Sequence, residues 1–368
     1  MANPRSRAGL NPQTGPLGYR LLIVTDAWAP QVNGVVRTVA MVADELRLLG
    51  DVVEVIGPDR FFTLPLPGYR EIRLAVLPLR RLRRLVDGFR PTTIHIATEG
   101  PLGWAMRRLC LARGWPFTTS FHTRFAEYLQ ARTRLPPGLA WALLRRFHNA
   151  GAGTFAATPS LQAELVGRGF RRVMPWTRGV DLALFVPGPS DEFAGLPRPI
   201  FLNVGRVAVE KNIEAFLALD LPGTKVVVGD GPQRAALAAR HPQVHFTGWR
   251  TGAALAAAYR AADVFVFPSR TDTFGLVTIE ALACGVPVAA FPVAGPLDIL
   301  GADGTGRHGG RGVIGAVGDD LEAAILKALC GDPAACVAEA RHYSWEQCTA
   351  AFEAGLAVST PVEPALAA

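Results

Sequence analysis

The sequence predicts an α/β protein with two domains, each a doubly wound parallel β-sheet. Three observations support this prediction. The chain has 368 residues, a length that suits two domains. Short apolar segments alternate with longer helical patterns, as they do in βαβ units. The alternation begins again near the middle of the chain, and a hydrophobic content of 49% is enough to fill large cores.

The first half of the chain contains a series of apolar segments of strand length. The first of them, residues 20–26, reads as a parallel strand buried on both faces. Helical patterns follow at about 36–49 and around 104–113. The expected strands are residues 20–26, 52–56, 93–97 and 117–121.

The second half repeats this pattern after a boundary that we place near residues 177–189. Its expected strands are residues 200–204, 225–228, 262–268 and 286–291. Helices are expected from about Asn212, from Gln233 and within residues 269–290. Two such domains should face a central cleft, and open parallel sheets bind ligands beyond the carboxyl ends of their strands. Functional side chains are therefore expected in the loops that follow strands.

Charge and cysteine content narrow the class of protein. The formal net charge of +7 fits simple solubility or an anionic partner, such as a phosphate, an acidic membrane or a nucleic acid. Five cysteines without a Cys-x-x-Cys pair argue against a disulfide framework or a zinc site and fit a reducing cytoplasm. No run of 18 apolar residues is present, so we expect a cytoplasmic protein without a transmembrane helix.

The first motif follows the strand that ends at Val204. Arg206 lies at the end of this strand, and Lys211, one of only three lysines, lies at the approach to the next helix. A guanidinium and an ammonium group in such a loop suit a diphosphate. The alternative is a surface ion pair with Glu210.

The second motif is SRTDTFGLVTIEALACGVPVAA, residues 269–290. A helix is expected to begin near Thr273, so the amides of Phe274, Gly275 and Leu276 would have no partner within the helix. Such amides, together with the helix dipole, form a site for an anion. Gly275 also lets a ligand approach the backbone.

Two carboxylates flank these amides. Asp272 precedes the helix and is placed to accept hydrogen bonds from sugar hydroxyls, and Glu280 lies two turns further on and is placed to accept them from a ribose. The alternatives are that Asp272 is the N-cap of the helix and that Glu280 is a solvated helix position.

Two residues of the first domain also follow strands. Gly34 comes after Asn33 where the first helix opens, and its missing side chain allows a ligand near the backbone. An Asn-Gly pair can also be a simple turn. His122 follows the strand 117–121, where ligand-site residues belong, although a single histidine is more often structural. The other motifs favour a site role for His122.

Several motifs are absent from the sequence. It has no Asp-x-Asp pair for a nucleotide-bound metal and no Walker sequence, so we expect no metal and no cofactor. Residues 151–156 match a dinucleotide fingerprint by letters, but a helix precedes them and a strand follows, the reverse of the required order. Nucleic-acid binding is not expected, because the arginines cluster beside leucines rather than exposed aromatic residues.

Together, these motifs resemble the retaining family 4 glycosyltransferases, which have the GT-B fold of two Rossmann-like domains. The resemblance covers roughly residues 19–356. The family usually has a glutamate where this chain has Asp272, and the form Thr-Asp-Thr-Phe-Gly resembles the branch of bacterial lipid glycosyltransferases and α-mannosyltransferases. The motifs that carry the resemblance are Gly34, His122, Gly205-Arg206, Glu210-Lys211, Gly229-Asp230-Gly231-Pro232 and Asp272-x7-Glu280.

The resemblance implies a metal-independent hexosyltransferase that uses a nucleotide-sugar and retains the anomeric configuration. It assigns Arg206 and Lys211 to the donor diphosphate and the leaving nucleotide, Asp272 to the transferred sugar and Glu280 to the ribose. His122 would lie near the donor sugar from the other domain. The acceptor would attack the same face that the nucleotide leaves, and the departing phosphate would take the acceptor's proton.

The resemblance also assigns the parts of the chain. It implies a nucleotide-sugar-binding Rossmann-like domain after an acceptor-side one, and a last helix that crosses back to the first domain. We expect a flexible tail at 1–18, the acceptor-side domain at 19–178, the nucleotide-sugar domain at 179–340, the returning helix at 341–356 and a flexible tail at 357–368.

Residues 79–86 suggest the acceptor. Leu82, Leu85 and Val86 lie on one helical face among arginines, as in an amphipathic helix at an anionic membrane surface. The alternative is a solvated basic face. The arginines that we place on the membrane and acceptor side are Arg80, Arg81, Arg83 and Arg84.

From these features we expect transfer from UDP-glucose, UDP-galactose or UDP-glucuronate to a membrane lipid such as diacylglycerol, with peripheral attachment to the inner face of the cell membrane. One alternative is a GDP-mannose-dependent α-mannosyltransferase that acts on a glycolipid or polysaccharide. A second is a sugar-nucleotide epimerase, which would need no acceptor. A non-catalytic subunit of the same fold is disfavoured, because it should have lost some of the site residues.

Overall fold

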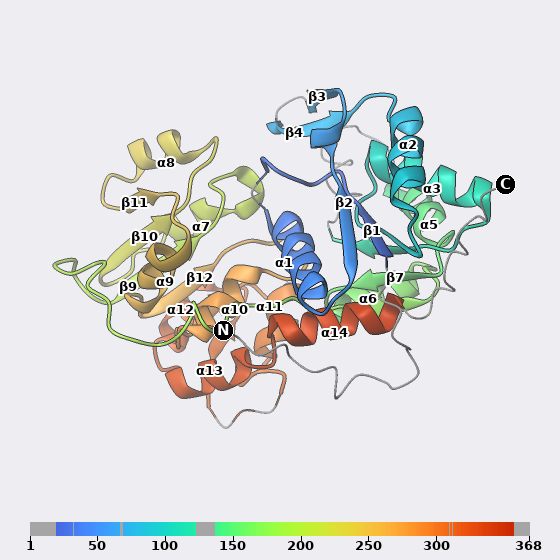
Figure 1. Ribbon diagram of the computed structural model, residues 1–368. Helices are drawn as coiled ribbons and strands as arrows, with labels where there is room; N and C mark the ends of the chain where they lie inside the picture. Colours follow the sequence, from blue (N-terminus) through green and yellow to red (C-terminus); the bar gives the residue numbers. More distant parts are fainter. Residues whose placement is uncertain are drawn as a thin grey trace. The chain divides into compact units, whose positions relative to one another are not determined.

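The computed structural model describes residues 20–31, 33–66, 69–122, 137–308, 310 and 312–356. The tails expected at 1–18 and 357–368 lie outside the described residues. The chain divides into two compact units, the first made of Met1–Thr177 and Trp345–Ala368 and the second of Arg178–Ser344 (Figure 1). Each unit contains a six-stranded parallel sheet, which confirms the predicted α/β class with two parallel-sheet domains.

The first unit has the strand order β2-β1-β5-β6-β7-β8 and a separate antiparallel pair, β3 and β4. Its strands are β1 (Arg20–Val24), β2 (Val52–Ile56), β3 (Thr63–Leu66), β4 (Tyr69–Ala75), β5 (Thr93–Ile96), β6 (Thr118–Phe121), β7 (Gly153–Ala156) and β8 (Val173–Pro175). Its helices are α1 (Gly34–Leu48), η1 (Pro58–Arg60), α2 (Leu79–Phe89), α3 (Pro101–Arg113), α5 (Pro137–His148), α6 (Pro159–Gly167) and α14 (Trp345–Leu356).

Both faces of this sheet are covered, as the uninterrupted apolar strands predict. Leu21 and Ile23 of β1 belong to the core that α1 and α14 cover, and these two helices lie side by side in Figure 1. Leu22 and Val24 belong to the core that α2 and α3 cover. Alternate residues of one strand thus anchor two helical layers, and the strand ends are held rigidly between them.

The second unit has the strand order β11-β10-β9-β12-β13-β14. Its strands are β9 (Ile200–Val204), β10 (Thr224–Val228), β11 (His245–Gly248), β12 (Val264–Phe267), β13 (Val288–Ala290) and β14 (Gly315–Val317). Its helices are η2 (Val209–Lys211), α7 (Ile213–Leu217), α8 (Arg234–Arg240), α9 (Gly252–Arg260), α10 (Leu276–Ala283), α11 (Ala294–Leu300), α12 (Leu321–Ala328) and α13 (Pro333–Ala340).

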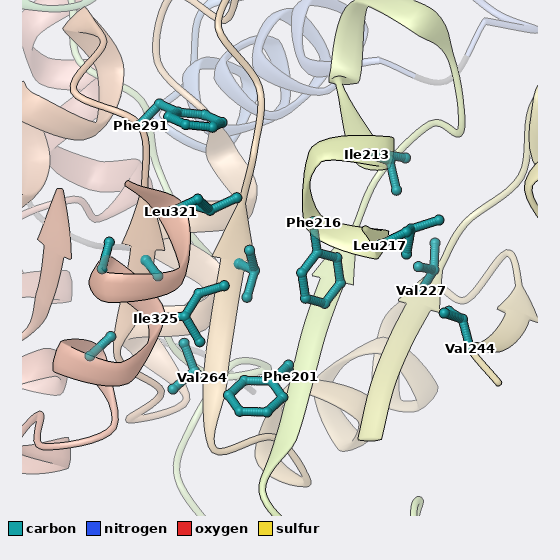
Figure 2. Packing of buried hydrophobic residues seen from close by; sticks show 14 of the residues in the cluster. Phe201, Ile213, Phe216, Leu217, Val227, Val244, Val264, Phe291, Leu321 and Ile325 are labelled. Carbon is teal, nitrogen blue, oxygen red and sulfur yellow. The ribbon is translucent and has the colours of Figure 1, made fainter. Parts of the chain in front are cut away.

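One face of the second sheet carries a continuous apolar core. Figure 2 shows Phe201 of β9 and Val264 of β12 against Phe216 of α7 and Ile325 of α12, all of them fully buried. Burial of one such side chain stabilises a fold by roughly 1.5–3 kcal/mol. The short helix α7 is therefore fixed on the sheet, and so is the loop that precedes it.

Candidate active site

The loops that follow the adjacent strands β9 and β12 are joined by side chains. Lys211 donates from Nζ to both carboxylate oxygens of Asp272, at 2.6 Å from Oδ1 and 2.9 Å from Oδ2. Asn212 donates to the carbonyl of Pro268 at 3.0 Å, and Thr271 donates to the carbonyl of Glu210 at 3.1 Å. The structure thus brings together Lys211 and Asp272, which lie 61 positions apart in the sequence.

This pairing keeps Asp272 ionised. Burial raises its pKa. The charge and hydrogen bonds of Lys211, a hydrogen bond from Ser269 and the charge of Arg206 together lower the pKa by more than burial raises it. The net result is a pKa below the usual value for aspartate. Asp272 is therefore a carboxylate at neutral pH, and it can accept hydrogen bonds from hydroxyl groups.

Arg206 lies in the same loop as Lys211 and forms an ion pair with Glu210. The ion pair that the sequence left as an alternative is thus present. The side chain of Arg206 is 29% exposed and that of Glu210 11%, so the guanidinium can still be reached from solvent. An anion that binds Arg206 has to compete with Glu210.

Helix α10 begins later than expected. Its N-cap is Gly275, with a left-handed backbone (φ 88°), and its first residue is Leu276. No side chain caps this end, so the N-cap alternative for Asp272 is wrong. A Cβ at position 275 would lie 3.0 Å from the ring of Phe267, and this contact, with the left-handed φ, favours glycine there.

Glu280 lies in the interior and not on a solvated face, so that alternative is also wrong. Its exposure is 2%, and the hydroxyl of Tyr259 on α9 donates to its Oε2 at 2.9 Å. Tyr259 is fully buried. Sequence reasoning missed this tyrosine, although a single aromatic residue in the alanine-rich helix 252–260 was a signal for a buried contact.

The motif Gly229-Asp230-Gly231 has a packing role. A Cβ at Gly229 would lie 1.8 Å from the carbonyl oxygen of Gly205, and one at Gly231 would lie 2.4 Å from that of Val207. The amide of Val207 donates to the carbonyl of Asp230 at 2.9 Å. The loops after β9 and β10 therefore touch backbone to backbone, which fixes the start of the loop that carries Arg206.

Phe274, which lies between Asp272 and the start of α10, packs against a group of buried side chains that the sequence did not reveal. Phe274 is buried and meets the ring of Tyr343 edge-on at 5.9 Å. Glu339 is 3% exposed and accepts a hydrogen bond from the hydroxyl of Tyr343 at 3.4 Å. It also accepts one from the backbone amide of His308 at 3.3 Å, and its Oε1 lies 2.7 Å from Nδ1 of the same histidine. His308 belongs to the glycine-rich stretch 301–310, which matched no motif. These contacts connect that stretch to Phe274.

The remaining predicted site residues, Gly34 and His122, belong to the first unit. Gly34 is the exposed first residue of α1, and the side chain of Asn33 accepts hydrogen bonds from the amides of Val35 and Val36, each at 3.0 Å. This cap explains why α1 starts two residues before the expected position. His122 is 7% exposed, and its Nε2 lies 2.8 Å from Oγ of Ser120.

Asp26, at the end of β1, is a buried carboxyl group that sequence reasoning did not single out. It accepts hydrogen bonds from the amides of Leu102 at 2.8 Å and Gly103 at 3.2 Å, and from the hydroxyl of Thr98 at 3.0 Å. Burial nevertheless raises its pKa to about 6, because desolvation outweighs these hydrogen bonds. Asp26 therefore binds the first turn of α3.

Helix α2 differs from the expected membrane helix. Leu82 and Val86 are fully buried in the core of the first unit, and Leu85 packs against that core. The apolar face of α2 is thus occupied by protein and is not available to a lipid surface, which corrects the expectation for these three residues. The arginines of the other face are all exposed, namely Arg80, Arg81, Arg83 and Arg84.

In the described part of the chain, no helix has the length and apolar character needed to cross a membrane. The same residues contain no group of three or more His, Cys, Asp and Glu side chains that could hold a metal ion. Arg132 and Arg134, further basic residues of the first domain, lie outside the described residues.

Glycosyltransferase family models match most of both units. The family model described as Glycosyltransferase Family 4 matches residues 32–184, and the model described as Glycosyl transferases group 1 matches residues 198–330. A GDP-mannose-dependent alpha-mannosyltransferase of Mycolicibacterium smegmatis is 36% identical over 313 residues, which are 78% of this chain and 83% of that protein.

Two further relatives extend the comparison. An alpha-monoglucosyldiacylglycerol synthase of Streptococcus pneumoniae is 26% identical over 85% of this chain and 79% of its own length. The solved structure of sucrose-phosphate synthase from Thermosynechococcus elongatus has the same fold, with a TM-score of 0.69 and 23% identity over 91% of this chain and 97% of that one. These relatives give the sugar-nucleotide epimerase alternative no support.

Proposed function

The chain belongs to glycosyltransferase family 4, and from this premise we propose that it transfers mannose from GDP-mannose to a lipid or glycolipid acceptor. The glycosyltransferase activity follows from the family. The choice of GDP-mannose over a UDP-sugar is supported by the α-mannosyltransferase that shares 36% identity across most of both chains. The comparison thus favours the donor that the sequence alone ranked second.

The observation that carries the chemistry is the pair of cations in the loop after β9, which is joined to the loop after β12 by the ion pair of Lys211 with Asp272. Arg206 and Lys211 each hold a carboxylate in one connected pair of loops. We infer that the donor diphosphate binds to both cations. Negative charge grows on the diphosphate as its bond to the sugar breaks, and fixed cations stabilise that charge. In this proposal, the amides at residues 274–276 assist them.

The carboxylates would hold the two ends of the donor. Asp272, kept ionised by Lys211, is proposed to bind hydroxyl groups of the transferred sugar, and Glu280 to bind the ribose. Gly34 is proposed to leave room for the donor at the start of α1, and His122 to contact the sugar.

We propose that the transfer retains the anomeric configuration. The bond between the anomeric carbon and the phosphate oxygen breaks, and the acceptor oxygen forms its bond to the same face of that carbon. The proton of the acceptor hydroxyl passes to the departing phosphate oxygen. The two cations keep the charged nucleoside diphosphate in place during this exchange.

A lipid acceptor is supported by an exposed patch near α2, which we call the apolar patch and which consists of Phe62, Leu64, Val76 and Leu77. Phe62 is 72% exposed, Leu64 54% and Leu77 90%. The amide of Val76 donates to the carbonyl of Phe62 at 2.9 Å, so the two segments are adjacent. Leu77 directly precedes Pro78 and the arginines of α2. Apolar side chains beside exposed arginines suit an anionic bilayer.

The test is turnover of a panel of sugar nucleotides with EDTA present. GDP-mannose, UDP-glucose, UDP-galactose and UDP-glucuronate would each be offered with anionic vesicles that contain diacylglycerol or a glycolipid. Nucleotide release and lipid products would be followed together, and the anomeric configuration of the product would be read by NMR. We expect a mannolipid in the α-configuration from GDP-mannose only.

A second candidate is transfer from a UDP-sugar to diacylglycerol, which the similarity to an alpha-monoglucosyldiacylglycerol synthase favours. Formation of a glycosyldiacylglycerol from a UDP-sugar would establish it and reject the mannose proposal. Nucleotide release that occurs only with a water-soluble carbohydrate would reject the lipid acceptor.

A further inference from the structure

Four polar side chains form a buried chain of hydrogen bonds in the first unit. Nδ1 of His95 lies 2.9 Å from Oγ1 of Thr118, and Nε2 of His95 lies 3.2 Å from Oγ of Ser120. The same Ser120 oxygen lies 2.8 Å from Nε2 of His122. His95 and Thr118 are fully buried, Ser120 is 1% exposed and His122 7%. This series of hydrogen bonds leads from the interior of the sheet to His122, which is a predicted residue of the active site.

A backbone carbonyl limits where the hydrogens can lie. Ser120 Oγ is also 3.2 Å from the carbonyl oxygen of the fully buried Ala97, and a carbonyl can only accept. With the single hydroxyl hydrogen of Ser120 on Ala97, that buried carbonyl has a donor. In this arrangement the two imidazole nitrogens that face Ser120 both carry hydrogens and donate to its lone pairs. In His95 this leaves Nδ1 as the acceptor for the hydroxyl of Thr118.

We propose that Ser120 is a positioning residue that holds His122 in the tautomer with hydrogen on Nε2 and the lone pair on Nδ1. In this arrangement each contact of the chain has one donor and one acceptor, and the buried carbonyl of Ala97 is satisfied. The importance of this tautomer for sugar transfer rests on the proposed function, but the tautomer itself does not. In this tautomer Nδ1 of His122 carries no hydrogen, so any hydrogen bond at that atom is one that it accepts.

The surroundings of His95 keep this arrangement fixed. Its ring meets Phe155, Trp176 and Phe352 edge-on, with centroids 4.9 to 5.8 Å away. Burial among these rings, with a smaller effect from His148, lowers the pKa of His95 to about 3. His95 therefore stays neutral at physiological pH and does not reverse the direction of the hydrogen bonds.

Imidazole nitrogen NMR tests the tautomer directly. The protein would be labelled with 15N-histidine, and the signals of His122 would be identified by their loss in H122Q. We expect a protonated, pyrrole-like Nε2 and an unprotonated, pyridine-like Nδ1 in the wild-type protein. The opposite tautomer, or an equal mixture of both, in the folded wild-type protein would overturn the inference.

Two variants distinguish an effect of the Ser120 hydroxyl on the tautomer of His122 from a general loss of stability. S120A removes the acceptor and should shift His122 toward a mixture of tautomers, whereas S120T keeps a hydroxyl and should preserve the wild-type spectrum. An unchanged tautomer in folded S120A would also overturn the inference. Loss of one neutral hydrogen bond predicts a fall in kcat of about 2- to 10-fold for S120A, with S120T close to wild type.

The kinetic result also distinguishes this inference from the proposed function. If S120A changes the tautomer but transfers sugar at the wild-type rate, the position of the hydrogen is established and the assigned role of His122 in transfer is wrong. If the wild-type protein transfers no sugar from any nucleotide donor, the proposed function fails, while the NMR result on the tautomer stands.

Discussion

At the scale of single residues, the proposed donor site depends on a few close pairs in and near the loops that follow β9 and β12, which we call the donor loops. Lys211 keeps Asp272 ionised through two hydrogen bonds, and Tyr259 donates to a buried oxygen of Glu280. In the first pair both partners are proposed ligands of the donor, and in the second Tyr259 holds the proposed ligand Glu280 in place. Changes at either partner should therefore alter donor binding.

Replacement of Lys211 by alanine should lower kcat/KM by about 100- to 1000-fold, because it removes a cation that stabilises the leaving diphosphate. The exposed Lys327 on α12 of the same unit provides a matched control, and K327A should leave kcat/KM unchanged. Steady-state kinetics with the accepted donor measures both. Equal effects of the two substitutions would contradict the assigned role of Lys211.

Replacement of Tyr259 by phenylalanine should lower the free energy of unfolding by about 1–3 kcal/mol, because Glu280 loses a buried hydrogen-bond donor. The affinity for the nucleoside diphosphate should fall as well. Urea unfolding and calorimetric titration measure the two quantities. An unchanged affinity in a folded Y259F protein would show that the orientation of Glu280 does not matter for the donor.

At the scale of elements, two helix starts depend on buried side chains from elsewhere in the chain. The first turn of α3 binds Asp26, and the segment before α10 rests on Tyr343 and Glu339 through Phe274. Both helices begin at the carboxyl end of a parallel strand, where ligands of such sheets bind. These contacts therefore set the shape of loops that are proposed to hold substrate.

Asp26 should make the stability of the first unit depend on pH. Its folded-state pKa of about 6 lies above the ordinary aspartate value of 3.8, so the folded chain holds the proton more tightly than the unfolded chain does. The resulting stabilisation is complete below about 3.8 and is lost as the pH rises through about 6. The free energy of unfolding of the wild-type protein relative to D26N should therefore be higher at pH 4.5 than at pH 7. A difference that does not change with pH would exclude the raised pKa.

Tyr343 should affect donor binding through its ring more than through its hydroxyl. Y343L removes the edge-on contact to Phe274 and should raise the KM for the donor several-fold with a smaller change in kcat, whereas Y343F keeps the ring. I325V in the core of the same unit serves as a control for lost stability alone. If I325V raises the KM as much as Y343L, the effect of Tyr343 is not specific to the donor loop.

At the scale of the whole molecule, the exposed surface of the first unit combines two features that favour lipid. The arginines of α2 are exposed, and the apolar patch lies next to the start of that helix. Each basic residue near an anionic membrane contributes about 1 kcal/mol of attraction. Apolar side chains that enter the interface add to this attraction.

The double variant F62S/L77S should reduce sedimentation with anionic vesicles by at least about tenfold, since each large apolar side chain contributes roughly 1.5–3 kcal/mol on burial. Leu48, at the end of α1, is 80% exposed in the same unit, so L48S is the matched control and should bind like the wild type. Equal binding by all three proteins would exclude the apolar patch as the membrane contact.

The sequence predicted the fold class, and it predicted which loops carry the candidate site, because strand patterns and strand-to-helix loops are local features. It could not predict that Glu280 is buried against Tyr259, because that contact depends on how α9 packs on α10. The apolar face of α2 shows the same limit. A hydrophobic stripe reveals that a helix has a partner, but the sequence does not say whether the partner is lipid or the core of the protein. The network around Glu339 joins segments 31 positions apart and left no local pattern.

The ion pairs of the donor loops have a consequence for ionic strength. Arg206 and Lys211 each already hold a carboxylate, so these loops carry their own counter-ions. In the proposed binding mode, a diphosphate would compete with Glu210 and Asp272 for the two cations and would release few salt ions into solution. Added salt should therefore change the donor affinity only slightly. The exposed arginines of α2 are surrounded by mobile ions, and their attraction to anionic lipid should weaken steeply in the same salt titration.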